Sequence, residues 1–212
     1  MQTLTAAAPL RALGARRILP LIDTDAPEQM AELADAFLRA RLPVVEVTLR
    51  RPRSLAALEQ LAQVPDMIVG AGTIMAARQV GDAVAAGAQF LVSPGLSKAV
   101  VDEASRLDVP IIPGVATATE LMAALDAGVT TVKFFPAATN GGPAAIRALA
   151  AVAPTVSWVP TGGIDASSAP AYLEIPIVLA AGGSWMCPAA LVDSGRWDEV
   201  RTLLDQASVL AS

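Results

Sequence analysis

Residues 67–95 read MIVGAGTIMAARQVGDAVAAGAQFLVSPG, and this stretch decides the fold class. Two largely apolar runs, 67–72 and 89–95, flank an Ala-rich segment that ends at Gly87. An apolar strand, a helix and a second apolar strand are typical of a βαβ unit, in which the two strands lie parallel. The stretch therefore predicts an α/β protein with a buried parallel sheet.

The same alternation extends over the rest of the chain. Eight apolar runs have starts spaced about 20–26 residues apart, as βα units require. We expect a helix over roughly Leu4 to Ala15 before the first run. No linker or change of composition divides the chain, so we expect residues 1–212 to form a single (β/α)8 TIM-barrel domain with a short N-terminal helix. The eight runs begin at Ile18, Val44, Met67, Gln89, Val109, Thr131, Val156 and Ile175.

Composition and charge limit the classes of function. The net charge of −5 and the lack of a basic cluster argue against binding to nucleic acid or to an anionic membrane. The longest uncharged stretch, Ile175–Val192, contains glycines and prolines that favour a strand, a loop and a helix start over a membrane span. The N-terminal residues lack the pattern of a signal peptide, and the single cysteine, Cys187, fits a reducing compartment. We expect a cytoplasmic protein.

The chain has no histidine and few lysines. With one cysteine and no histidine, a zinc site made from these residue types is not expected, and we predict no metal. A general base must then be a carboxylate, a lysine, a tyrosine or a water held by the backbone. Lys98 and Lys133 are the lysines among 15 Lys and Arg residues, so a lysine inside an apolar strand needs an explanation.

Lys133 lies in such a strand, TVKFFP at 131–136, and shares a face with Thr131 and Phe135. Barrel active sites lie at the C-terminal ends of the strands. Burial favours a neutral amine over an ammonium ion, and a neutral amine can attack a ketone to form a Schiff base. The alternative is a structural lysine that extends to solvent or pairs with Glu46. Lys98 is expected to be solvated.

The run VVEVTLR at 44–50 places Glu46, Thr48 and Arg50 on one face and apolar residues on the other. We expect the polar face to point into the barrel and the apolar face to pack on helices. A buried ion pair without a catalytic role is the alternative interpretation.

Glycines follow four of the predicted strands. The segments 161–164 (TGGI) and 182–184 (GGS) end strands seven and eight, where many barrels bind phosphate through backbone N–H groups. Two tight turns are the alternative. At 70–73 (GAGT) and 93–95 (SPG), glycine would let a ligand approach the backbone closely, although ordinary turns would need it as well. The segment Asn140–Gly142 is ambiguous and could simply start a helix.

Six of these motifs, in this order and spacing, resemble the 2-keto-3-deoxy-6-phosphogluconate (KDPG) and 4-hydroxy-2-oxoglutarate (KHG) aldolase family. The resemblance runs from about Ile18 to the C-terminus. Many relatives carry a hydroxyl residue where this chain has Ala116, which puts a minor substrate contact in doubt. The motifs are EVTLR at 46–50, GAGT at 70–73, SPG at 93–95, KFFPA at 133–137, PTGGI at 160–164 and GGSW at 182–185.

The resemblance implies a class I aldolase, a carbon–carbon lyase, that needs no cofactor and forms a homotrimer. It implies that Lys133 forms the Schiff base and that Glu46 is the acid and base. It implies that the pyruvate end of the substrate is held by Arg50 and Thr73 and lined by Pro94 and Phe135. We expect the phosphate to be bound at Thr161, Gly162, Gly163, Gly183 and Ser184.

The implied substrates are small keto-deoxy sugar acids. KDPG would be cleaved reversibly to pyruvate and the aldehyde glyceraldehyde 3-phosphate, and KHG to pyruvate and glyoxylate. Alternatives are an aldolase for another keto-deoxy sugar acid, such as the phosphogalactonate epimer, and a sugar-phosphate isomerase, which would not need a lysine on the sixth strand. A pyridoxal phosphate barrel usually places its lysine near the first strand. A non-catalytic assembly protein would not need polar residues at five strand ends.

Overall fold

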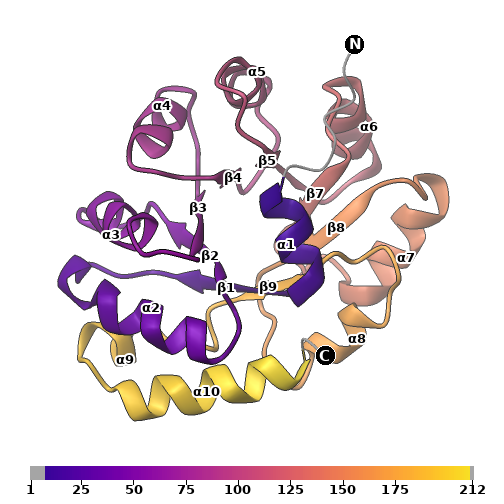
Figure 1. The fold of residues 1–212 in the computed structure, drawn as a ribbon. Coiled ribbons are helices and arrows are strands. Elements are labelled where there is room, and N and C mark those ends of the chain that lie inside the picture. Colours follow the sequence, from indigo (N-terminus) through magenta and orange to yellow (C-terminus); the bar gives the residue numbers. More distant parts are fainter. Residues whose placement is uncertain (1–7, 211–212) are drawn as a thin grey trace.

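The computed structural model describes residues 8–210 and shows parallel strands surrounded by helices (Figure 1). Six strands pair in the order β5-β4-β3-β2-β1-β9 and three in the order β6-β7-β8. Their bounds are β1 (Ile18–Ile22), β2 (Val44–Thr48), β3 (Ile68–Gly72), β4 (Phe90–Val92), β5 (Ile111–Ile112), β6 (Gly114–Val115), β7 (Thr131–Phe134), β8 (Ser157–Pro160) and β9 (Ala181–Gly183).

The two sheets join into one barrel. The chain passes from β5 through Pro113 directly into β6, so the fifth strand pairs with β4 on one side and β7 on the other. On the opposite side, bridges between Trp158 and Val178 and between Thr161 and Gly182 connect β8 to the β9 segment. The predicted (β/α)8 barrel is confirmed.

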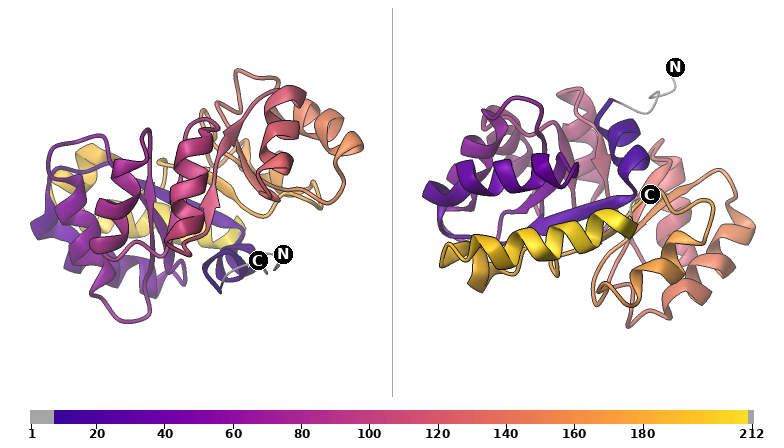
Figure 2. Two further views of the ribbon diagram at one scale, coloured as in Figure 1. Left: turned by 90° about the horizontal axis from the view of Figure 1, so that it is seen from above. Right: turned by 60° about the horizontal axis from the view of Figure 1, so that its bottom comes forward.

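Helices cover the outside of the barrel, as the two views in Figure 2 show. No helix within the described residues 8–210 is both long and apolar enough to cross a membrane. The helices are α1 (Ala8–Arg16), the 3-10 turn η1 (Pro27–Gln29), α2 (Met30–Arg39), α3 (Ser54–Ala62), α4 (Arg78–Ala85), α5 (Lys98–Arg106), α6 (Ala118–Asp126), α7 (Gly142–Val152), α8 (Ala169–Leu173), α9 (Ala189–Asp193) and α10 (Trp197–Leu210).

Two apolar clusters fill the space around and inside the barrel. Val45 and Val47 of β2 belong to the larger cluster, which packs the sheet against the helices, as the sequence pattern predicts. The smaller cluster lies inside the barrel and joins Val44 and Phe90 to Leu10 and Leu13 of α1. Because α1 lies across one end of the barrel (Figure 1), the strands' C-terminal end is left for a pocket.

The fifth and eighth strands differ from the prediction. The fifth divides at Pro113, which has no backbone N–H to continue a ladder. The eighth begins at Ala181 and not at Ile175, because the chain turns after α8 and Val178 N–H bonds back to the Ile175 carbonyl at 2.9 Å. The N-terminal helix is found from Ala8, and the rest of its predicted range lies outside the described residues.

The helix ends carry residues that commonly begin or end helices. Gly87 and Gly128 have φ of +97° and +78°, as expected of glycines that end helices. Ser97 stands at the start of α5, but its side chain makes no capping bond. The structure shows instead a capping box on α6, in which Thr117 and Glu120 bond each other's backbone N–H groups. The backbone N–H of Ala116 also donates to the Glu120 carboxylate, and this hydrogen bond is the main reason that the pKa of Glu120 is lowered.

This capping box gives a prediction for stability. Thr117→Ala removes the hydroxyl that accepts the Glu120 N–H, so we expect a loss of about 1 kcal/mol. In a thermal melt this should lower Tm by about 2–4 °C. Thr117→Ser keeps the hydroxyl and is the matched control. An equal loss in both variants would show that the methyl group, and not the cap, stabilises this end of α6.

Candidate active site

A cavity of about 280 Å³ opens at the C-terminal end of the barrel strands. Leu21, Thr48 and Ile164 line it in addition to the residues proposed from the sequence. Leu21 is the last inward-facing residue of β1, so strand alternation alone could have identified it. Thr48 lies between Glu46 and Arg50 on the face that the sequence predicts to point inward. The proposed residues that line it are Glu46, Arg50, Thr73, Pro94, Lys133, Phe135, Thr161, Gly162, Gly163, Gly183 and Ser184.

Lys133 and Glu46 meet inside this cavity from β7 and β2. Lys133 Nζ lies 3.5 Å from Glu46 Oε1, and the two side chains are 6% and 0% exposed. The amine also lies 5.3 Å from the centre of the Phe135 ring. Neither carboxylate oxygen of Glu46 accepts a hydrogen bond from the described residues. A buried carboxylate beside an amine, with its lone pairs unused, can exchange a proton with the amine or with a bound molecule.

The glycines of β3 make room for side chains of the protein. A Cβ on Gly72 would lie 2.0 Å from Glu46 Oε1, and one on Gly70 would lie 2.3 Å from the Phe90 ring. The expected close approach of a ligand to these two glycines is therefore wrong, because Glu46 and Phe90 fill the space. Thr73, the next residue, has φ of +62°, which is uncommon for a residue other than glycine and occurs often at functional sites.

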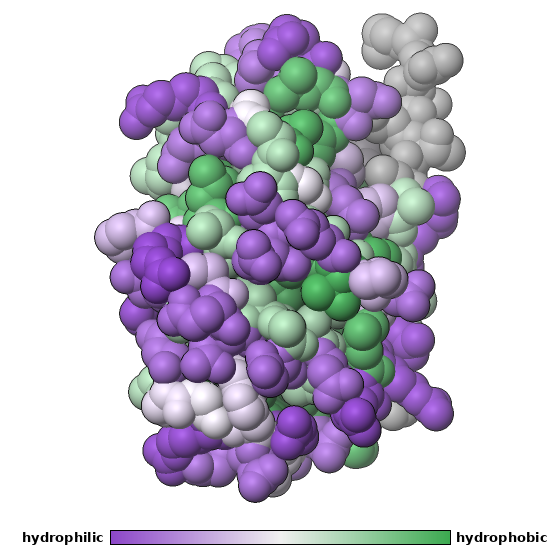
Figure 3. Space-filling model, turned by 60° about the vertical axis from the view of Figure 1, so that its left-hand side comes forward, coloured by the Kyte–Doolittle hydropathy of each residue, from purple (hydrophilic) through white to green (hydrophobic). Residues whose placement is uncertain are grey.

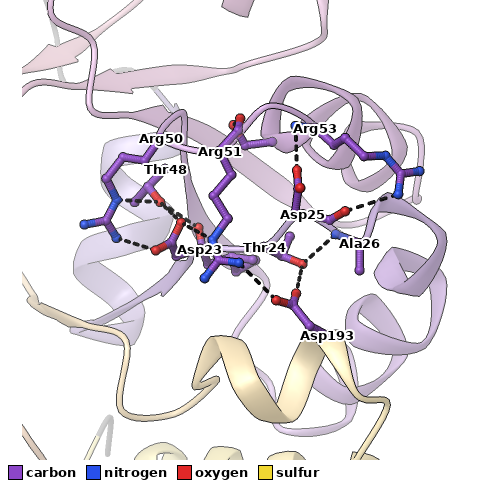
Figure 4. Close-up of polar contacts among 11 residues, drawn as sticks. Asp23, Thr24, Asp25, Ala26, Thr48, Arg50, Arg51, Arg53 and Asp193 are labelled. Carbon is purple, nitrogen blue, oxygen red and sulfur yellow. Dashed lines mark hydrogen bonds and ion pairs between the residues drawn. The ribbon is translucent and has the colours of Figure 1, made fainter.

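Arg50 supplies a positive charge to the cavity. Its Nη2 lies 3.1 Å from Asp23 Oδ2, and its Nε donates to Thr48 Oγ1 at 3.3 Å (Figure 4). The Arg50 side chain is 53% exposed, so one side of it contacts solvent while the other contacts Asp23 and Thr48. A guanidinium held in this way can take a carboxylate through two parallel N–H bonds.

The loops after β8 and β9 offer free backbone donors. Gly162 and Gly163 have φ of +97° and +72°, a conformation that favours glycine. Among the described residues, nothing accepts the backbone N–H groups of Gly162, Gly163 or Ser184. Adjacent free N–H groups in a tight turn form a concave site for an anion such as phosphate.

The remaining sequence candidates lie outside the cavity. Lys98 is 80% exposed and pairs with Asp102 at 2.6 Å, as expected for a solvated lysine. Gly142 starts α7, with Gly141 before it, so the Asn140–Gly142 segment is a helix start. Burial raises the pKa of the Cys187 thiol to about 12. Within residues 8–210, no three acidic, cysteine or histidine side chains come together as a metal site.

Comparisons with known proteins agree with this geometry. The family model for KDPG and KHG aldolase matches residues 11–203. The KHG/KDPG aldolase of Escherichia coli K12 is 38% identical over 191 residues, which are 90% of each chain. The crystal structure of the Zymomonas mobilis ZM4 KDPG aldolase with 3-phosphoglycerate is 36% identical, with a TM-score of 0.91 and 97% of each chain covered.

A third relative bears on the chemistry. The KDPG aldolase of Legionella pneumophila, crystallised with pyruvate captured as a covalent carbinolamine intermediate, is 37% identical with a TM-score of 0.90. The match covers 95% of this chain and 98% of that one. Since the family model and these relatives span nearly the whole barrel, this chain belongs to the KDPG and KHG aldolase family.

Proposed function

We propose that this chain is a class I aldolase that reversibly cleaves KDPG to pyruvate and glyceraldehyde 3-phosphate. The observation that carries the proposal is the buried pair of Lys133 and Glu46, 3.5 Å apart in a cavity that also holds Arg50. Cleavage of KHG to pyruvate and glyoxylate uses the same chemistry at the pyruvate end. Membership of the family and the bifunctional E. coli relative support both activities.

In the proposed mechanism, Lys133 acts as the nucleophile. Its neutral Nζ attacks the C2 ketone, and the carbinolamine loses water to give an iminium ion. The iminium is an electron sink, so the C3–C4 bond can break when Glu46, directly or through a water, removes the proton of the C4 hydroxyl. The aldehyde leaves, and the enamine takes a proton at C3. Hydrolysis of the iminium then releases pyruvate and restores the amine.

The other cavity residues hold the two ends of the substrate. Arg50 and Thr73 bind the carboxylate next to the ketone, and Pro94 and Phe135 line this end. The free N–H groups of the two glycine loops, with Thr161 beside them, bind the phosphate at the other end. Because the phosphate lies far from the bond that breaks, its binding serves to position the reacting carbons. The cavity residues proposed to bind the phosphate are Thr161, Gly162, Gly163, Gly183 and Ser184.

We also propose that the chain forms one barrel domain and works as a homotrimer in the cytoplasm without a cofactor. Large apolar side chains remain on the surface, including Met75 and Met122, which are 65% and 66% exposed. Figure 3 shows apolar surface between polar side chains on one side of the molecule. Contacts between subunits would remove such side chains from water, which supports an oligomer.

Borohydride trapping tests the nucleophile. Reduction in the presence of pyruvate should add one covalent adduct per chain, and peptide mass mapping should place it on Lys133. Lys133→Arg places a guanidinium, which does not form a Schiff base, beside Glu46 and should give no adduct. Lys98→Arg, the matched control, should trap as the wild type does. An adduct on Lys98, or one that persists in Lys133→Arg, would contradict the assignment of Lys133 as the Schiff-base residue.

Glu46→Gln tests the proton-transfer group. We expect the Schiff base with pyruvate to form while the cleavage rate falls by about 10²–10⁴-fold. Gly72→Ala should give a related defect with the carboxylate still present, because its Cβ would displace Glu46. If Glu46 were only the structural partner of Lys133, Glu46→Gln would instead lose about 3–5 kcal/mol of stability. A much lower Tm of Glu46→Gln, with normal turnover by the protein that remains folded, would therefore contradict the catalytic role.

Ser184→Asp tests the phosphate site. Ser184 is exposed at the mouth of the cavity, so the change should leave the fold intact and place a negative charge where the phosphate binds. We expect KM to rise at least about tenfold for KDPG and to change little for the unphosphorylated analogue. Ser184→Ala is the uncharged control. Equal changes in KM for both substrates would show that this loop does not bind the phosphate.

A further inference from the structure

Asp23 stands between two arginines at the edge of the cavity. It directly follows β1, and its two carboxylate oxygens face different partners (Figure 4). Asp23 Oδ2 lies 3.1 Å from Arg50 Nη2, and Asp23 Oδ1 lies 3.2 Å from Arg51 Nε. The side chain is only 25% exposed. One carboxylate therefore separates two like charges that are adjacent in the sequence and would otherwise repel each other.

Asp23 is itself held from the far side. Arg51 Nη1 pairs with Asp193 Oδ2 at 3.2 Å, and Asp193 is the last residue of α9. The other oxygen of Asp193 accepts the hydroxyl of Thr24, which is fully buried, at 2.5 Å. Charges thus alternate along a chain of contacts from Asp193 through Arg51 and Asp23 to Arg50. A network of this kind fixes long side chains better than a single exposed ion pair does.

The contacts to Arg50 select which edge of its guanidinium stays free. Thr48 takes Nε and Asp23 takes Nη2, while Nη1 has no partner in the part of the chain that the structure describes. Thr48 is fixed in turn, because its hydroxyl donates to the Ile22 carbonyl at 3.1 Å. The edge formed by Nη1 and the second hydrogen of Nη2 is therefore available for a bidentate carboxylate.

We propose that Asp23 is a positioning residue that sets the affinity of this enzyme for the carboxylate of its 2-keto acid substrate. The inference rests on the proposed role of Arg50 in binding that carboxylate. Arg50 is 53% exposed and flexible by nature, so without Asp23 its ordering would have to accompany substrate binding. Asp23 orders it beforehand, and Arg51 and Asp193 keep Asp23 in place.

The negative charge of Asp23 has an effect on carboxylate binding that is opposite to the effect of ordering Arg50. Asp23 also cancels part of the positive charge that attracts a carboxylate. If charge mattered more than position, Asp23→Asn would tighten pyruvate binding. If position matters more, the same change weakens pyruvate binding, because Arg50 loses its anchor and no carboxylate then separates it from Arg51.

The experiment measures the ligand concentration that gives half-maximal borohydride trapping, in the full-length chain. Two ligands are compared: pyruvate, and acetone, which has the ketone but no carboxylate. Four variants are needed: Asp23→Asn, Arg50→Gln, the double variant, and Glu28→Gln. The last removes a nearby surface ion pair with Arg53, 3.0 Å long, and should behave as the wild type does.

We expect Asp23→Asn to raise the half-maximal pyruvate concentration by about five- to tenfold, with the maximal trapping and the acetone dependence unchanged. The half-maximal pyruvate concentration of the double variant should be no higher than that of Arg50→Gln, since Asp23 acts through Arg50. Equal weakening for acetone and pyruvate, tighter pyruvate binding, or no change in Asp23→Asn would each overturn the positioning role. If Arg50→Gln itself left the pyruvate dependence unchanged, the proposed carboxylate site at Arg50 would fail first.

Discussion

A lysine and a glutamate lie 3.5 Å apart inside a barrel whose interior is otherwise filled mainly by apolar side chains. Burial of such a pair costs free energy unless the two groups compensate each other closely, so the surrounding structure must hold them together. β2 and β7 present them from different sides, and Gly72 leaves out the Cβ that would displace Glu46. α1 packs against the opposite end of the barrel, and the pair lines the cavity at the strands' C-terminal end.

The rest of the site can be understood from the position of this pair. The ketone carbon of a substrate must reach Lys133 Nζ. The charged ends of the substrate must therefore be bound elsewhere along the cavity. Arg50 stands at the cavity with one edge braced by Asp23 and Thr48. The turns after β8 and β9 supply N–H groups that no described residue accepts, and no positive side chain of residues 8–210 lines this end of the cavity. The two ends of the cavity thus differ in chemistry, which favours a substrate with a carboxylate at one end and a phosphate at the other.

Local patterns predict much of this architecture because they depend only on neighbours in the chain. Alternation along 44–50 and 131–136 was enough to place Glu46 and Lys133 inside the barrel. The glycine pairs identified the loops at the cavity mouth. Contacts between distant segments could not be predicted: that Glu46 occupies the space over Gly72, that Pro113 divides a strand between two neighbours, or that Asp23 meets Asp193 through Arg51. These depend on which strand ends lie side by side in the folded barrel.

A crystal structure of the protein after exposure to pyruvate would show directly whether Lys133 forms the bond to the substrate. We expect continuous electron density from Lys133 Nζ to C2 of the ligand, with its carboxylate against Arg50 and Thr73 and with Glu46 within hydrogen-bonding reach of the new bond. Pyruvate bound in the cavity without a bond to Lys133, or bonded to a different residue, would contradict the assignment of Lys133 and Glu46 as the reaction centre.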